Sequence, residues 1–393
     1  MARASATRRR PPSGLDALLA AKEMVVVCGT GGVGKTTTSA ALGVMAATHL
    51  GGRVLVVTVD PARRLAHAMG LDELSNDEVK VPLESLVADG VTPRGELWAA
   101  MLDTKASWDD LIRRHAPDAK VRDTVLANPL YDNITSRFVH SHDYIAMERL
   151  YDLHRSGLYD LVIIDTPPSR NALDFLDAPA RMADFFGSRL LRWLTVPYRS
   201  RIFTAASKPF YQVADRVLGS RFLQDIAEFF LLFQTMEKGF VARAREVERL
   251  LTDPRTMFCV VTTLEVTPLV ETRFFADALA ERKLPLDAVV ANKVLPADLR
   301  APAAAKAAQI IRRQRGELAA ELAPKVRSTP AKVEGVLTEI VDRFDDISVV
   351  ASREAERLGE LADVAPVLVT VPALDSDIHD LNGLLVLGTH LWP

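Results

Sequence analysis

Residues 24–38 read MVVVCGTGGVGKTTT, and this stretch decides the fold class. An apolar run rich in β-branched residues opens it, and a helical pattern begins where it ends. Between the two, Gly29, Gly34, Lys35 and Thr36 satisfy the spacing G-x-x-x-x-G-K-[ST]. The order of strand, glycine-rich loop and helix predicts a phosphate-binding loop (P-loop) at the end of a buried strand.

The residue types in this loop suit a nucleoside triphosphate with Mg²⁺. Glycines let backbone N–H groups converge on phosphate oxygens at the start of a helix. We expect Lys35 to contact the β- and γ-phosphates and the Thr36 hydroxyl to bind Mg²⁺. A glycine-rich turn with an accidental GKT is the alternative. The predicted nucleotide-binding residues of the loop are Gly29, Thr30, Gly31, Gly32, Val33, Gly34, Lys35, Thr36 and Thr37.

Short apolar runs recur along the chain and have the composition of buried strands. Helical patterns lie between several of them, as in residues 36–50, which end at Gly51-Gly52. Such alternation predicts an α/β fold with a doubly wound, mostly parallel sheet. The predicted strands are 24–28, 53–60, 160–165, 257–263, 287–292 and 366–372.

Two stretches, about 104–158 and about 175–253, are too long for simple crossovers and have helical patterns. Pro197 and Pro209 should divide the second into separate helices. We therefore predict a helical subdomain inserted into the P-loop domain.

The remaining divisions of the chain follow from composition. Residues 1–13 are basic and predict a disordered tail, which leaves 14–393 as the P-loop domain. Residues 297–362 are rich in Ala, Arg and Glu, and predict an exposed helix at AAAKAAQIIRRQRGELAAEL (303–322).

Composition excludes several classes of function. The 48 Lys and Arg against 51 Asp and Glu in 393 residues give a charge of -3, so nucleic acid is not expected as a partner. Only Cys28 and Cys259 are present, which excludes a cysteine zinc site and fits a reducing cytoplasm. No apolar run reaches the roughly 18 to 20 residues of a transmembrane segment.

Two aspartates follow predicted strands and so belong at the carboxyl edge of the sheet, where ligands bind. Asp165 in DLVIIDTPPSR is our candidate for holding Mg²⁺ through water, although an Asp that caps the next turn is the alternative. Asp60 in VTVDPARRL is our candidate for orienting the attacking water, with helix capping as its alternative.

Five segments in this order resemble the ArsA-type ATPases, which include arsenite-pump subunits and tail-anchored-protein targeting ATPases. The segments are GTGGVGKTT, VTVDPARRL, DTPPSRNALDFL, ANKVLP and VPALDSDI, and the similarity covers most of residues 24–390. DTPPSRNALDFLDAP looks closest to the actinobacterial branch of the family.

The resemblance implies a dimeric ATPase with a deviant phosphate-binding loop. It implies that Asp60 lies in switch I and positions water, and that residues 165–169 form switch II. It makes Asn292 the adenine-reading residue, with Pro372 near the base. Asn292 as a simple cap and Pro372 as a strand end are the alternative interpretations.

Thr30 departs from the family pattern G-K-G-G-x-G-K-[ST], in which the first lysine reaches the phosphates of the other subunit. A threonine brings no charge to the transferring phosphoryl group, so we expect weak hydrolysis by a homodimer. A paralogous partner that has the lysine would supply the charge. Alternatively, Arg63, Arg64 or Arg170 replaces the lysine, or hydrolysis is slow by design.

Ten of the fifteen Phe residues fall between 175 and 240, and residues 222–236 have a wide apolar helical face. This pattern fits either a packed subdomain or a groove for a hydrophobic helical protein client. We therefore expect a client-handling ATPase, with membrane-protein targeting as one such role. A weakly hydrolysing regulatory or scaffold subunit is the alternative.

Two other functions have little support in the sequence. Arsenite needs several soft thiolate ligands, and Cys28 and Cys259 lie on separate predicted strands. His140 and His142 lack an H-E-x-x-H context, and we interpret them as surface or interface residues.

Overall fold

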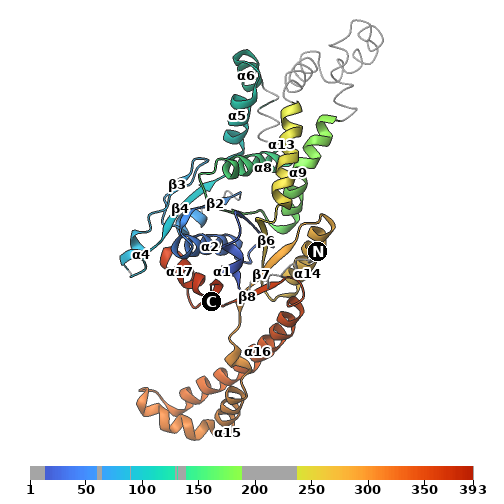
Figure 1. The fold of residues 1–393 in the computed structure, drawn as a ribbon. Helices are drawn as coiled ribbons and strands as arrows, with labels where there is room; N and C mark the ends of the chain where they lie inside the picture. Colours follow the sequence, from blue (N-terminus) through green and yellow to red (C-terminus); the bar gives the residue numbers. More distant parts are fainter. Residues whose placement is uncertain are drawn as a thin grey trace, which may run out of the picture.

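The computed structural model describes residues 14–59, 64–88, 90–128, 131, 139–187 and 237–392. Figure 1 shows a twisted sheet with helices on both faces, a group of helices above it and a long helical hairpin below it. The predicted tail at 1–13, Pro197 and Pro209 lie outside the described residues.

Eight strands form one sheet in the order β3-β4-β2-β5-β1-β6-β7-β8. They are β1 (Met24–Cys28), β2 (Gly52–Thr58), β3 (Val79–Lys80), β4 (Gly95–Met101), β5 (Leu161–Asp165), β6 (Thr256–Thr262), β7 (Leu286–Val294) and β8 (Val367–Pro372). The pairing in this sheet is parallel except between β3 and β4. Strands accumulate on both sides of β1, which confirms the predicted doubly wound α/β fold.

All six predicted strands are present, and β4 is a long strand that the sequence pattern did not predict. Its sequence, GELWAAM, has no β-branched residue and favours a helix by local propensity. Pairing overrides that preference, because β4 runs beside β2 from Gly52↔Gly95 to Thr58↔Met101. A Cβ on Gly95 would lie 2.2 Å from the Gly52 carbonyl oxygen, so the close approach of the two strands requires glycine.

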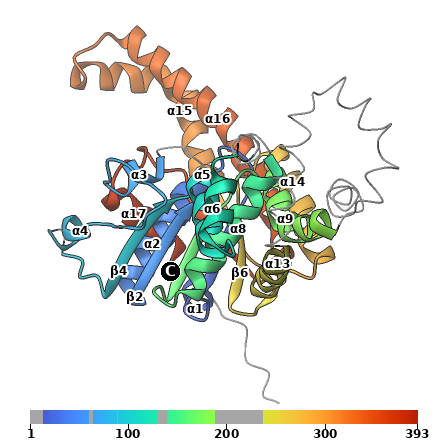
Figure 2. The same cartoon turned by 90° about the horizontal axis from the view of Figure 1, so that it is seen from above.

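Helices cover the two faces of the sheet and bury a core on each (Figures 1 and 2). Successive residues of β1 point to opposite faces, so Val25 and Val27 join one core and Met24 and Val26 the other. On the first face lie α1 (Leu15–Leu19), α2 (Lys35–His49), α3 (Arg64–Ala68), α4 (Glu84–Ala88) and α17 (Leu381–Leu391). Because each buried aliphatic side chain contributes about 1.5–3 kcal/mol, these two cores provide most of the stability of the domain.

The upper helices occupy the described parts of both stretches that the sequence predicts as helical (Figure 1). They are α5 (Thr104–His115), α6 (Ala119–Leu126), α8 (Val139–Arg155), α9 (Ser169–Gly187) and α13 (Glu237–Thr252). Asp103 and Asp118 cap α5 and α6 by accepting backbone N–H groups at 2.8 Å. Trp108, Tyr144 and Phe240 pack together in a third core between these helices.

A buried ion pair crosses this third core. Arg243 on α13 donates through Nε to both carboxylate oxygens of Glu148 on α8, at 3.0 Å each. The Tyr144 hydroxyl also donates to Glu148. The side chain of Glu148 is only 1% exposed, and its burial raises the pKa of the carboxyl group. The pair therefore joins α8 to α13 inside an otherwise apolar contact.

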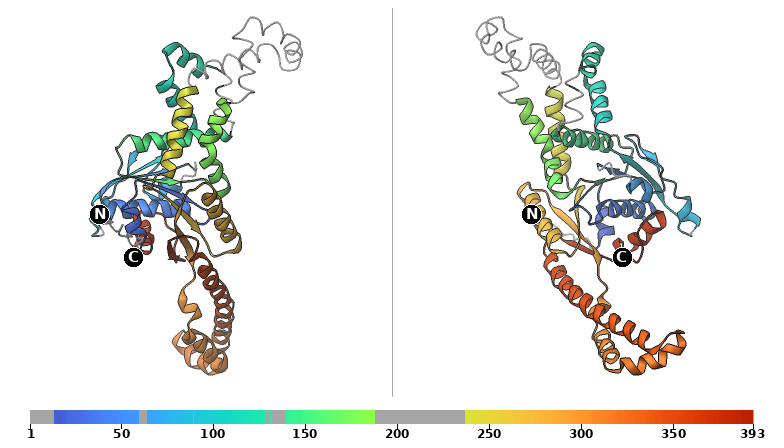
Figure 3. Two further views of the ribbon diagram at one scale, coloured as in Figure 1. Left: turned by 45° about the vertical axis from the view of Figure 1, so that its right-hand side comes forward. Right: turned by 180° about the vertical axis from the view of Figure 1, so that it is seen from behind.

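The lower hairpin is inserted between β7 and β8 and projects away from the sheet (Figure 3). It consists of a short 3-10 helix, η1 (Ala297–Arg300), followed by α15 (Pro302–Lys325) and α16 (Pro330–Leu361). The predicted helix at 303–322 is thus present, and it packs antiparallel to α16. In the sheet region, α14 (Val266–Glu281) joins β6 to β7. None of the described helices is long and apolar enough to cross a membrane.

Candidate functional site

The glycine-rich loop connects β1 to α2 and depends on backbone conformations that favour glycine. Gly29, Gly32 and Gly34 have φ values of 149°, 82° and 96°. A Cβ on Gly29 would lie 2.1 Å from the Val261 carbonyl oxygen, and one on Gly34 would lie 2.4 Å from Asn292 Nδ2. These glycines therefore let the loop fit tightly between the ends of β6 and β7.

The start of α2 has the features of an anion site. Gly34 is its N-cap, and no side-chain hydrogen bond caps the helix among the described residues. Its first N–H groups lie at the positive end of the helix dipole and have no side-chain cap in the described part of the chain. Lys35 is only 8% exposed and its Nζ donates to the Thr30 carbonyl oxygen at 2.9 Å. A buried amine beside a helix N-terminus fits the binding of a phosphate group.

Thr36, Thr58 and Asp165 converge at the carboxyl edge of the sheet. Thr36 Oγ1 donates to Asp165 Oδ2 at 2.7 Å, and Thr58 Oγ1 donates to the same oxygen at 3.0 Å. Asp165 is 1% exposed. Hydroxyl and carboxylate oxygens are ligands that suit Mg²⁺, and phosphates and waters normally complete its shell. This donor set therefore fits a magnesium ion held beside a bound triphosphate.

Asn292 near the end of β7 is packed directly against the loop. Its Nδ2 donates to the Val33 carbonyl oxygen at 2.8 Å, and its Oδ1 accepts the N–H of Lys293 at 2.9 Å. Asn292 is 8% exposed. The structure thus brings Asn292 to the loop, whereas Pro372 lies one strand further out, paired with Val294.

Several candidate residues lie outside what the structure describes. Asp60 and Arg63 belong to the undescribed segment 60–63, and the side chains of Arg64 and Arg170 are also outside the described set. The chain just before that segment is described: the Val59 N–H donates to the Asp165 carbonyl oxygen at 3.1 Å. The end of β2 therefore lies directly beside Asp165.

Sequence reasoning missed two threonines that shape the site. Thr58 hydrogen-bonds Asp165, as described above, and Thr166 Oγ1 donates to the Val27 carbonyl oxygen at 2.8 Å. Each ends or follows an apolar strand at the carboxyl edge of the sheet, where ligands bind. The sequence signal available for these residues is therefore a hydroxyl at the end of a strand, which is a weaker indication of a site than a carboxylate.

The two cysteines lie on neighbouring strands but on opposite faces of the sheet. Val27 pairs with Cys259 and Cys28 with Val260, so Cys259 belongs to one core and Cys28 to the other. Burial raises the pKa of the Cys28 thiol to about 12 and also raises the pKa of Cys259. The two thiols cannot join as ligands of one ion, and both remain protonated at neutral pH.

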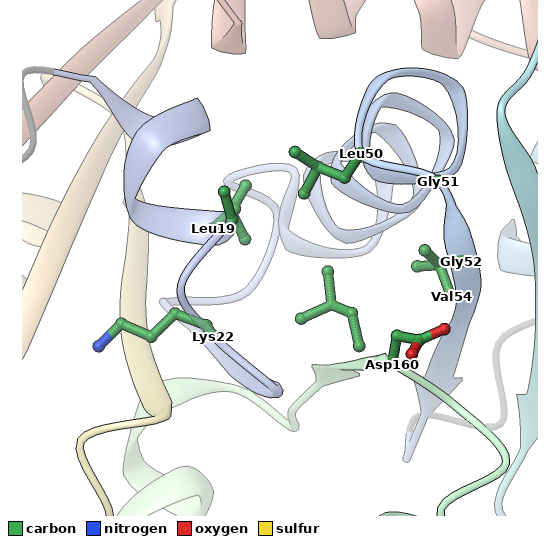
Figure 4. Close-up of a pocket in the computed structure, with 9 residues that line it drawn as sticks. Leu19, Lys22, Leu50, Gly51, Gly52, Val54 and Asp160 are labelled. Atoms are coloured by element: carbon green, nitrogen blue, oxygen red, sulfur yellow. The ribbon is translucent and has the colours of Figure 1, made fainter.

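A cavity of about 420 Å³ lies at the opposite, amino-terminal edge of the sheet (Figure 4). Leu19, Leu50, Val54 and Asp160 line it. Its Lys22 directs Nζ away from the cavity and donates to the Pro254 carbonyl oxygen at 2.9 Å. A largely apolar cavity with one carboxylate does not suit a triphosphate, and it lies at the edge of the sheet opposite to the one where ligands bind in α/β folds. The P-loop therefore remains the candidate site.

Comparison with known proteins decides the family. The family model for anion-transporting ATPases (ArsA ATPases) matches residues 22–321, which include the loop, Asp165 and Asn292. This chain belongs to the ArsA ATPase family. The predicted resemblance is thus confirmed, and the chain is an ATPase.

Three relatives illustrate the range of the family. The ATPase BagA of Mycobacterium tuberculosis is 24% identical over 390 residues, which cover 96% of this chain and 95% of BagA. The putative arsenical pump-driving ATPase 1 of Aquifex aeolicus is 25% identical over 285 residues, 70% of this chain and 64% of that protein. The ATPase GET3 of Komagataella phaffii is 24% identical over 277 residues, 70% of this chain and 73% of GET3.

Proposed function

We propose that this ArsA-family ATPase binds MgATP at the P-loop and uses ATP binding and hydrolysis to close a dimer that handles a protein client. We further propose that a paralogous ATPase supplies the lysine that position 30 lacks, although a homodimer is the simpler arrangement. The proposal of a lysine-bearing partner depends on the presence of Thr30 at this position of the loop.

Thr30 lies within the loop and takes part in it through its backbone. Its carbonyl oxygen accepts the Lys35 amine, while its buried Oγ1 has no hydrogen-bond partner among the described residues. A neutral side chain here cannot stabilise the charge of a transferring phosphoryl group in a second subunit. A cation supplied in trans is worth about 10³–10⁵ in rate in arginine-finger enzymes.

The other residues have roles that follow from their positions. Lys35 and the N–H groups at the start of α2 would hold the phosphates, and Thr36 would bind Mg²⁺ with Asp165 holding one of its waters. When bound, Mg²⁺ neutralises charge on the phosphates. Asn292, anchored to Val33, would position the adenine base, with Pro372 beside it. Asp60 would orient the attacking water.

Client handling is supported by the family resemblance and by the apolar face of residues 222–236, which lies outside the described residues. Phe175 and Phe240 are described, and both are fully buried, so they belong to the packing of the subdomain. A hydrophobic helical segment, such as that of a membrane protein, is the client chemistry that an apolar helical face fits. Two buried free thiols support a cytoplasmic location.

A regulatory or scaffold subunit that hydrolyses ATP weakly is the second candidate, and the same Thr30 favours it. An arsenite-pump role has less support, because Cys28 and Cys259 face opposite sides of the sheet.

The test is the steady-state ATPase rate of the purified chain and of Thr30→Lys, with Thr30→Gln as an uncharged control of similar length. We expect slow hydrolysis by the wild type and at least a tenfold increase for Thr30→Lys only. Mixing the wild-type chain with a lysine-bearing paralog should raise its ATPase rate in the same way. Lys35→Ala in this chain should reduce that increase in the mixture. A Thr30→Lys rate equal to the wild-type rate overturns the missing-charge argument.

Client handling has its own test. Asp60→Asn should hold ATP unhydrolysed, so a pull-down from native lysate should retain both a second P-loop ATPase and helical membrane proteins. Recovery of this chain alone would favour a self-contained nucleotide switch.

A further inference from the structure

The last turns of α16 contact the chain just after two strands of the sheet. Glu354 Oε2 accepts the N–H of Leu295, which follows β7, at 2.9 Å. Arg357 Nη1 donates to the carbonyl oxygen of Leu264, which follows β6, at 2.7 Å. Glu354 and Arg357 are three residues apart, so they lie on the same side of the helix. One turn of α16 therefore holds the carboxyl ends of two neighbouring strands.

The same two strand ends also contact the P-loop. The end of β7 does so through Asn292, whose Nδ2 donates to the Val33 carbonyl oxygen at 2.8 Å. The end of β6 does so through Val261, whose carbonyl oxygen would lie 2.1 Å from a Cβ on Gly29. Each strand end is therefore in contact both with the P-loop and with α16.

The backbone between Asn292 and Leu295 has an unfavourable conformation. Lys293 has a φ of 58°, in the left-handed region that disfavours a residue with a Cβ. Such a conformation persists only where the surrounding contacts determine it. Asn292 fixes the first end of this segment through Val33, and Glu354 fixes its other end through the Leu295 N–H.

α16 provides a firm support for this contact. Its 32 residues form one continuous helix, and its last residue, Leu361, is fully buried in one of the two cores of the sheet. Leu358 packs against the same core. Figures 1 and 3 show α16 running from the far end of the hairpin to the sheet. The end that contains Glu354 and Arg357 is thus part of the sheet domain, although most of the helix projects from it.

We propose that Glu354 is a positioning residue for ATP: it fixes the chain after β7 so that Asn292 keeps the orientation in which it meets the adenine base. This inference rests on the proposed role of Asn292 in base recognition. Arg357 steadies the same turn of α16 against the end of β6. Glu354 acts by accepting a backbone N–H, so a glutamine oxygen should replace its carboxylate, whereas alanine should not.

The test is calorimetric titration of the full chain with the Mg²⁺ complex of a non-hydrolysable ATP analogue. We expect Glu354→Ala to weaken binding about tenfold, because a backbone N–H loses a charged acceptor. The KM for ATP should rise by a similar factor with little change in kcat. Glu354→Gln should bind within about twofold of the wild type. Glu360→Ala is the matched control on α16, because its ion pair with Arg273 is exposed and should contribute little.

A double variant distinguishes positioning from general loss of stability. If Glu354 acts through Asn292, then Glu354→Ala/Asn292→Ala should bind the analogue no more weakly than Asn292→Ala alone. Competition with GTP should show a reduced preference for ATP in Glu354→Ala as well as in Asn292→Ala. A role of Glu354 in stability alone predicts effects on affinity that add, with no change in base preference.

Three outcomes overturn the proposal. They are wild-type affinity in Glu354→Ala, failure of Glu354→Gln to retain binding, and additive effects of the two substitutions in the double variant. The proposed function fails separately, because it requires Lys35→Ala to lose ATP binding and Asn292→Ala to weaken it whatever residue stands at position 354.

Discussion

Thr36 Oγ1 donates to Asp165 Oδ2 across 2.7 Å, although the two residues are 129 positions apart in the chain. Thr36 lies in the first turn of α2 and Asp165 ends β5, so the contact joins the P-loop to the neighbouring strand of the sheet. Thr58 at the end of β2 donates to the same carboxylate oxygen. Three separate elements thus meet at the oxygen that we propose to hold a magnesium-bound water.

The Thr36–Asp165 contact predicts a specific magnesium defect. Thr36→Ala removes the proposed ligand, and we expect at least a tenfold fall in the ATPase rate together with a higher Mg²⁺ requirement. Thr36→Ser keeps the hydroxyl and should retain most of the activity. The measurement is the ATPase rate as a function of Mg²⁺ concentration. Equal Mg²⁺ dependence of Thr36→Ala and the wild type would contradict the assignment.

Asn292 should contribute to base recognition through its contact with Val33. Asn292→Ala leaves the Val33 carbonyl oxygen without this donor, which costs about 1–3 kcal/mol where the group is buried. We expect ATP affinity to fall by about 10-fold to 100-fold, with reduced preference for ATP over GTP. Titration with a fluorescent ATP analogue, with GTP as competitor, measures both effects. Asn76→Ala is the control, because Asn76 Oδ1 accepts a hydrogen bond from Ser107 rather than from a residue of the P-loop. Unchanged affinity and base preference would make Asn292 a structural residue only.

Gly34 should tolerate no side chain. Its φ of 96° strains any L-residue, and a Cβ would lie 2.4 Å from Asn292 Nδ2. We expect Gly34→Ala to abolish measurable ATP binding by calorimetry, because it displaces the start of α2 and Asn292 together. Gly157→Ala is the matched control: it has a φ of 65°, but its Cβ meets no atom within 4 Å. It should lower stability by about 1 kcal/mol and leave binding unchanged. Normal binding by Gly34→Ala would show that the loop adapts.

The sequence predicted the sheet well because six of its strands are buried and rich in β-branched residues. It did not predict β4, whose residues favour a helix and whose strand conformation comes from pairing with β2. It placed an exposed helix at 303–322 but carried no indication that α15 and α16 form one projecting hairpin. That arrangement depends on packing between helices, which local helix propensity does not report.

The arrangement of the candidate site was predictable from the sequence only in part. The strand–loop–helix context identifies the loop, and the strand ends identify Asp165. The hydrogen bonds of Asp165 to Thr36 and Thr58 could not be predicted, because they depend on which strands are neighbours in the sheet. The contact of Asn292 with Val33 spans 259 positions and likewise follows from sheet order rather than from local sequence.

The Glu148–Arg243 pair predicts a pH-dependent loss of stability. Arg243→Met leaves a buried carboxylate without its cation, and we expect a loss of about 3–5 kcal/mol near neutral pH. Arg249→Met on the same helix is the control, because its ion pair with Glu246 is exposed and should contribute almost nothing.

The direction of the pH effect follows from the raised pKa of Glu148 in the folded protein. A carboxyl whose folded pKa is raised binds more protons in the native state, so it stabilises the fold at low pH and loses that effect as pH rises through the folded pKa. Arg243 lowers the pKa of Glu148, and its removal should raise that pKa further. Arg243→Met should therefore cost less stability at pH 5 than at pH 8. Urea denaturation at both pH values measures this difference in the free energy of unfolding. An equal loss of stability at the two pH values would show that the lost packing of the Arg243 side chain is responsible, rather than the charge on Glu148.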